Sequence, residues 1–168
     1  MPHRRPPLLQ ALSQALRATP ELDRRVVVVG VGSTLRSDDA AGLRIAEALR
    51  TLALPNVLVL FGDTAPENVT GEVRRARPSH VLFVDAADLG ESPGSVRLLD
   101  AAEIGGMSSS THTLPLGVIA DYLTRDLGCR VLFLGLQPKS VAFGEGLSRE
   151  VSSAVAETTE ALACALGA

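Results

Sequence analysis

The sequence predicts an α/β fold, a three-layer α/β/α sandwich around a five-stranded, mostly parallel sheet. Short, continuously apolar runs such as 26–31 and 80–84 alternate with longer amphipathic stretches. This order is typical of a parallel sheet covered by helices on both faces. The segment 95–99 alternates apolar and polar residues and follows 80–84 with no helix between them. We therefore expect 95–99 to be an antiparallel edge strand.

The 168 residues contain no repeat or linker and are long enough to bury one core. Prolines or glycines after the apolar periodic stretches mark the ends of helices. Right-handed crossovers place 57–61 and 80–84 on either side of the strand at 25–31. Ser37 or Asp38 can cap the helix that follows this strand. We expect strands at 25–31, 57–61, 80–84, 95–99 and 130–136, and helices at about 39–51, 66–76, 116–127 and 148–166.

Residues 1–24 are predicted to form an N-terminal arm or short helix, separate from a domain at 25–168. Polar residues interrupt its apolar stretch, so it is a poor signal peptide. No apolar run in the chain approaches the ~20 residues of a membrane-spanning helix. The apolar face of the arm would carry Leu8, Leu9, Leu12 and Leu16.

Charge and composition argue against a nucleic-acid partner. The net charge is −3, and aromatic residues make up 3% of the chain, with no Trp. Neither property suits a protein that binds nucleic acid. Cys129 and Cys164 have no spacing typical of a metal or redox pair, which favours a reducing compartment, the cytoplasm.

Acidic residues follow two strands that should be neighbours. Asp38 and Asp39 come after the valine run, in VVVVGVGSTLRSDDAAG, and Asp85 ends the strand at 80–84. Ligands of such sheets bind beyond the carboxyl ends of the strands, where the strand order reverses. An unpaired buried charge is costly, so these acids indicate a site. Capping of a helix by Asp38, or of a loop by Asp85, is the structural alternative.

One histidine can join these acids. His3 and His80 are expected at the surface, whereas His112 lies in a polar loop before the helix at 116–127. Asp39, Asp85 and His112 would form a site of two oxygens and one nitrogen, which suits Ni or Zn. Three protein ligands leave a coordination position open for chemistry.

Two other functions remain open on the residues alone. Gly30 and Gly32 resemble part of a dinucleotide-binding turn, but Leu35 stands where the third glycine belongs. A nucleotide- or small-ligand-binding module would also have to place an anion beside Asp38 and Asp39. A self-sufficient metallohydrolase with permanent zinc is the second alternative.

Several separated blocks resemble one family in order: GVGSTLRSDDAAG, GDTAPEN, VLFVDAADLGESPGSVRLLD, STHTLPL and VLFLGLQP. They are similar to the NiFe-hydrogenase maturation endopeptidases, most of all to those serving the hydrogenase of formate hydrogenlyase. The resemblance runs from Arg25 to about Leu166. It implies a phosphorylase/hydrolase-like sandwich around a five-stranded sheet with one antiparallel strand. It also implies an enzyme that removes the C-terminal extension of a nickel-loaded large-subunit precursor, with nickel supplied by the precursor and no organic cofactor.

The resemblance also assigns roles to residues. The family's three metal-binding positions fall on Asp39, Asp85 and His112, which would be both metal ligands and catalytic residues. Ser33 stands where the family usually has Asn, and Gly62-Asp63 replaces its usual Gly-Gly. The loops GDTAPEN and QPKSVAFGEG lie at the same edge of the sheet by topology. Our candidates for substrate contacts are Asp38, Asp63, Glu67 and Gln137, with capping as the alternative for Asp38 and Asp63.

Overall fold

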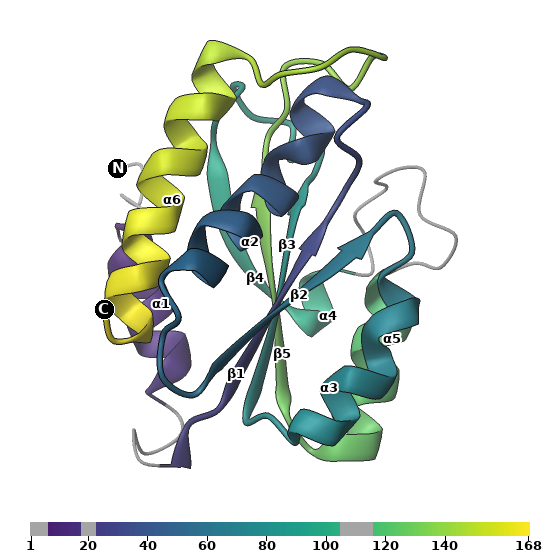
Figure 1. Ribbon diagram of the computed structural model, residues 1–168, viewed down its shortest axis with the longest axis vertical. Helices are drawn as coiled ribbons and strands as arrows, with labels where there is room; N and C mark the ends of the chain where they lie inside the picture. The colour runs from purple at the N-terminus through teal and green to yellow at the C-terminus, as the bar shows by residue number, and fades with distance from the viewer. Residues whose placement is uncertain (1–6, 18–22, 105–115) are drawn as a thin grey trace.

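A five-stranded sheet forms the middle layer of the computed structural model, in the order β2-β1-β3-β5-β4 (Figure 1). The structure describes residues 7–17, 23–104 and 116–168. Neighbouring strands are parallel except for β4, which pairs antiparallel with β5. The predicted fold class is therefore confirmed, including the antiparallel edge strand. The strands are β1 (Val26–Val31), β2 (Val57–Asp63), β3 (His80–Ala86), β4 (Val96–Asp100) and β5 (Arg130–Leu136).

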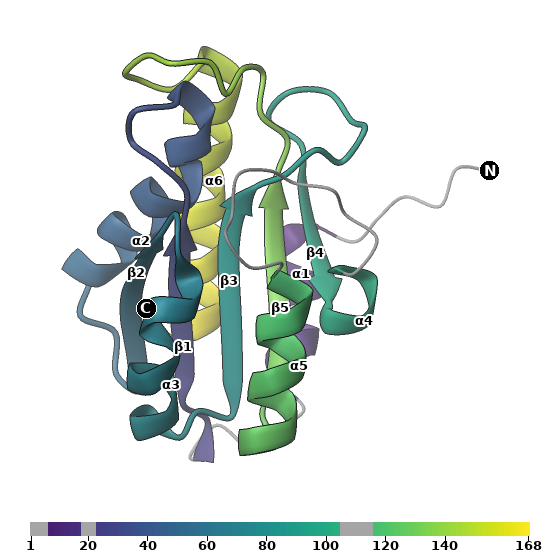
Figure 2. The same ribbon diagram turned by 90° about the vertical axis from the view of Figure 1, so that its right-hand side faces the viewer.

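Helices cover both faces of this sheet (Figures 1 and 2). Residues of α1, α2 and α6 share one apolar core, and residues of α3, α4 and α5 share the other. Val26 and Val28 of β1 belong to the first core, and Val27 and Val29 to the second. Successive side chains of a strand point to opposite faces, so a strand between two cores must be apolar throughout. The helices are α1 (Leu8–Leu16), α2 (Ala41–Thr51), α3 (Thr70–Ala76), α4 (Ala101–Ile104), α5 (Leu116–Leu127) and α6 (Arg149–Leu166).

Several element ends differ from the sequence prediction. The helices expected at 39–51 and 66–76 each begin as a 3-10 turn, η2 (Ser37–Ala40) and η3 (Pro66–Val69). In the described part of the chain, no side chain makes a capping hydrogen bond at the start of η2 or α2, so the capping expected of Ser37 or Asp38 is wrong. The short helix α4 was not predicted.

The N-terminal helix α1 belongs to the core. Leu12, Ala15 and Leu16 are buried, but Leu9, which was expected on the same apolar face, is 39% exposed. The carbonyl oxygen of Ala15 accepts hydrogen bonds from Arg130 Nη1 at 2.9 Å and His80 Nε2 at 3.2 Å. The expectation of a surface position for His80 is wrong, since only 1% of it is exposed. None of the described helices has the length and apolar character needed to cross a membrane.

Candidate active site

The segment after β1 passes directly over the carboxyl ends of the two central strands. At Gly32, which has φ +136°, an added Cβ would lie 1.8 Å from the carbonyl oxygen of Asp39. At Gly42, an added Cβ would lie 2.1 Å from the carbonyl oxygen of Val84. Only glycine permits backbones to approach this closely. The two glycines thus hold η2 and the start of α2 against the ends of β1 and β3.

This arrangement brings Asp39 and Asp85 to the same edge of the sheet. Asp39 lies in η2, which contacts β3, and Asp85 is the penultimate residue of β3. Asp39 is 5% exposed and Asp85 is fully buried. Burial raises the energy of a carboxylate unless a cation or hydrogen-bond donors stabilise it. The pair can therefore contribute two oxygen ligands to a divalent ion.

The predicted third ligand, His112, lies outside the described residues. Across 7–17, 23–104 and 116–168, no group of three His, Cys, Asp or Glu side chains is placed to hold a metal ion. The described part of the site therefore supplies two carboxylates, Asp39 and Asp85.

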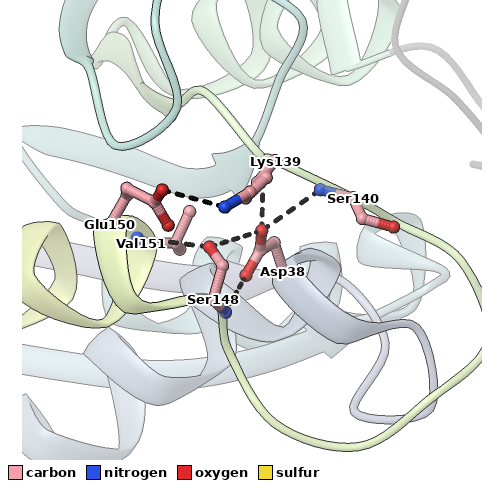
Figure 3. Close-up of polar contacts among 6 residues, drawn as sticks. All are labelled: Asp38, Lys139, Ser140, Ser148, Glu150 and Val151. Carbon is pink, nitrogen blue, oxygen red and sulfur yellow. Dashed lines mark hydrogen bonds and ion pairs between the residues drawn. The ribbon is translucent and has the colours of Figure 1, made fainter.

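Asp38 has a different environment from its neighbour, although it is also buried. Its Oδ1 accepts a hydrogen bond from the backbone N–H of Ser148 at 2.7 Å. Its Oδ2 accepts from the Ser148 hydroxyl at 2.9 Å and from the backbone N–H groups of Lys139 at 2.9 Å and Ser140 at 3.3 Å (Figure 3). Direct contact with a substrate would require breaking these bonds, so the geometry suits a positioning residue.

The hydrogen bonds also set the charge of this carboxyl group. Burial alone raises the pKa of Asp38, but the donors on Ser148, Lys139 and Ser140 outweigh it and lower the pKa below its usual range. Asp38 is therefore ionised at neutral pH, next to Asp39 in the chain.

Asp38 belongs to a larger connection between the β1–η2 loop (32–36) and the β5–α6 loop (137–148). Ser37 donates from its backbone N–H to the Gly144 carbonyl and from its hydroxyl to the Ala142 carbonyl, both at 2.8 Å. Gly144 N–H in turn donates to the Leu35 carbonyl at 3.0 Å. The two loops, which are more than 100 residues apart in the chain, therefore form one unit.

The remaining predicted substrate contacts divide into two kinds. Asp63 is exposed at the end of β2, with φ +49°, and its carbonyl accepts from Gly32 N–H at 2.8 Å. Glu67 is half-buried in η3, and within the described part of the chain its Oε2 is buried with no hydrogen bond. Gln137 is 9% exposed, and its Oε1 accepts from the Leu89 N–H at 2.6 Å and the Glu91 N–H at 3.3 Å. Gln137 thus orders the loop after β3, while Asp63 is exposed and Glu67 is half-buried.

The cysteines offer no activated nucleophile. Burial raises the pKa of the Cys129 thiol, which keeps it protonated and unreactive. Cys164 is exposed near the end of α6.

Sequence reasoning missed the partners of Asp38. Ser148 carries a local signal, because it precedes a long amphipathic helix and accepts a 3.4 Å hydrogen bond from Val151 N–H as the N-cap of α6. Nothing in the pattern connects this cap with Asp38. The glycine turn also differs from a phosphate cradle, since the Asp39 carbonyl oxygen, an acceptor, occupies the space beside Gly32.

Several relatives in sequence are hydrogenase maturation proteases. The family model described as "Hydrogenase maturation protease" matches residues 43–164. The chain is 38% identical to the hydrogenase 3 maturation protease of Escherichia coli K12 over 130 residues, which are 77% of this chain and 83% of that protein. It is 30% identical to a putative hydrogenase maturation protease of Methanocaldococcus jannaschii, over 71% of this chain and 76% of that one.

Solved structures that resemble this chain include proteins of the same kind. The crystal structure of a NiFe-hydrogenase maturation protease from Thermococcus kodakarensis KOD1 superposes with a TM-score of 0.79 and 33% identity, over 86% of this chain and 93% of that chain. A hydrogenase maturating endopeptidase from E. coli gives a TM-score of 0.72 and 29% identity, over 84% of this chain and 91% of that chain. Sequence and fold together show that the chain belongs to the hydrogenase maturation protease family.

Proposed function

We propose that this protease removes the C-terminal extension of a nickel-loaded large-subunit precursor of a NiFe-hydrogenase. The observation that carries the proposal is the burial of Asp39 and Asp85 at one edge of the sheet, in a chain of the hydrogenase maturation protease family. The precursor is the protein substrate, and nickel arrives as part of it. No organic cofactor enters the proposal.

Asp39, Asp85 and His112 are the residues proposed to bind the nickel of the precursor. Two carboxylates and one imidazole suit a divalent ion of borderline hardness. A divalent ion can polarise a peptide carbonyl or lower the pKa of a water molecule toward neutrality, which supplies hydrolysis without a serine or cysteine nucleophile. The burial of Asp39 and Asp85 makes their preference for a cation strong, because water screens them poorly.

The remaining candidates would act on the substrate in two ways. Asp63 and Glu67, on the β2–α3 side of the site, are proposed to contact the tail of the precursor. Asp38 and Gln137 are proposed to act through the loops that they order. Support for this division comes from the hydrogen bonds that already occupy the side chains of Asp38 and Gln137.

We also propose a cytoplasmic reaction without nucleic acid or membrane partners. Both cysteines are free, as is usual in a reducing compartment, and the net charge of −3 does not favour polyanions.

The test is to incubate the purified chain with candidate large-subunit precursors, with and without nickel. Processing is measured as the decrease in the size of the precursor. Asp39→Asn, Asp85→Asn and His112→Ala should each reduce processing at least ~100-fold, since each removes a ligand needed in the transition state. Asp88→Asn is the matched control, because Asp88 is an exposed acid three residues after Asp85. Full processing by the Asp39 and Asp85 variants would refute the site. Processing of a nickel-free precursor by a zinc-containing enzyme would instead identify a self-sufficient metallohydrolase.

A further inference from the structure

Three large apolar side chains are exposed on the joined loops beside the proposed active site. Phe143 is 86% exposed, Leu35 56% and Val141 38%. Single exposed apolar residues are ordinary. Here, however, the residues lie on two loops whose backbones are hydrogen-bonded to each other, and we call these three exposed side chains the apolar loop surface.

The backbone under this surface is fixed at several points. Arg36 Nε donates to the Val141 carbonyl at 3.1 Å, and Gly144 N–H, next to Phe143, donates to the Leu35 carbonyl at 3.0 Å. The base of the β5–α6 loop is held by Asp38 (Figure 3). A fixed loop loses little conformational entropy when a partner binds. An aromatic side chain on such a support is the usual form of a binding hot spot.

The surface is continuous with the site itself. Leu35 is four residues before Asp39, and Ser37, between them, bonds the loop that carries Phe143. In both ribbon views, the β1–η2 loop and the β5–α6 loop lie side by side at the edge of the sheet where β1 and β3 end (Figures 1 and 2). A polypeptide whose peptide bond reaches Asp39 and Asp85 would therefore approach the edge of the sheet at which these two loops lie.

We propose that the apolar loop surface, formed by Leu35, Val141 and Phe143, docks an apolar segment of the hydrogenase large-subunit precursor beside Asp39. This inference rests on the proposed function and adds a specificity determinant to it. The surface supplies binding energy without touching the reacting atoms. Its loss should therefore raise KM more than it lowers kcat.

The test is steady-state processing of nickel-loaded precursor by Phe143→Ala and Leu35→Ala, compared with the wild-type chain. Phe143→Ala should raise KM roughly tenfold or more, and Leu35→Ala by roughly threefold or more, the losses typical of truncating interface side chains. Phe143→Leu should restore most of the affinity, because it keeps an apolar side chain. Leu52→Ala is the matched control, since Leu52 is 49% exposed at the far end of α2. It should leave KM unchanged.

The outcomes separate this inference from the proposed function. If Phe143→Ala and Leu35→Ala have the wild-type KM, while Asp39→Asn still abolishes processing, the docking surface is wrong. The proposed protease function then stands. A wild-type chain that processes no precursor overturns the proposed function itself. If the wild-type chain self-associates in sedimentation, and Phe143→Ala dissociates it without changing KM, the surface binds a second copy of the chain and the inference is wrong. Since all three side chains are exposed, urea midpoints should stay at the wild-type value.

Discussion

Asp38 and Ser148 are joined by two hydrogen bonds, from the Ser148 backbone N–H to Oδ1 at 2.7 Å and from its hydroxyl to Oδ2 at 2.9 Å. Asp38 precedes α2, and Ser148 is the N-cap of α6. The same carboxylate therefore connects the starts of two helices of one core and places Asp39 beside a fixed loop.

Replacing either member of this pair should destabilise the fold. Asp38→Asn should lower the free energy of unfolding by about 2–3 kcal/mol, because an amide nitrogen cannot accept the bonds that a carboxylate oxygen accepts. Ser148→Ala should cost about 1–2 kcal/mol, since it removes both a donor to Asp38 and the helix cap. Urea unfolding measures both values. Ser153→Ala, on the exposed side of α6, is the control and should stay within about 0.5 kcal/mol. Equal stability of Ser148→Ala and Ser153→Ala would contradict the prediction.

His80 should make stability depend on pH. Burial lowers its pKa below the ordinary 6.5, the Ala15 carbonyl opposes this, and the charges of Arg130 and Arg24 lower it further. As pH falls below 6.5, the unfolded chain takes up the proton first, so the free energy of unfolding falls, by at most about 1.4 kcal/mol per pH unit. Urea unfolding between pH 7 and pH 5 should show this loss, and His80→Gln should reduce the slope. An unchanged slope in the variant would assign the pH dependence to other groups.

Gly42 should tolerate no side chain. A Cβ there would lie 2.1 Å from the Val84 carbonyl oxygen and 2.6 Å from that of Val31, so α2 would have to move away from both strands. Gly42→Ala should cost at least about 3 kcal/mol and should abolish processing by displacing Asp39 from Asp85. Gly71→Ala is the contrasting variant, because among the described residues a Cβ at Gly71 of α3 would meet only Arg75 Nη1, at 3.8 Å. It should stabilise the chain by about 0.5–1 kcal/mol. Thermal unfolding of the two variants gives the comparison, and similar losses in both would contradict the packing argument.

The N-terminal helix should contribute to stability as part of the core. Leu12 is 1% exposed in the core that α1 shares with α2 and α6, whereas Leu9 of the same helix is 39% exposed. Leu12→Ala should lower the free energy of unfolding by about 2–5 kcal/mol, the range of buried leucine truncations. Leu9→Ala should cost less than about 1 kcal/mol. If both variants unfold at the wild-type urea concentration, α1 is a dispensable arm.

Much of the fold could be predicted because its signals are local. The unbroken apolar runs of β1 and β3 directly reflect burial on both faces, and the ranges of α5 and β5 match their predictions. Strand ends were less predictable. β2 continues through Gly62 and Asp63, because pairing with β1 extends to Val31. Residue preference alone would end it earlier.

Contacts between distant segments account for the errors at the site. Asp38 seemed a helix cap because Asp commonly is one, but its four donors come from residues 139–148. His80 seemed a surface residue because it begins a strand next to Pro78, yet α1 covers it. Neither contact leaves a periodic or motif-like trace in the sequence. The acids at the ends of β1 and β3 were accessible to prediction because strand order alone brings them to one edge.

The pairing of the β1–η2 loop with the β5–α6 loop also constrains how new relatives can arise. A chimera that imports residues 137–148 from another family member would bring its own backbone N–H and carbonyl groups to Asp38, Ser37 and Arg36. The graft should therefore depend on the length and backbone path of the imported loop more than on its side chains, with the Ser148 hydroxyl as the exception. Evolution at this edge of the sheet should accordingly change side chains more readily than loop length, in two stretches that lie more than 100 residues apart.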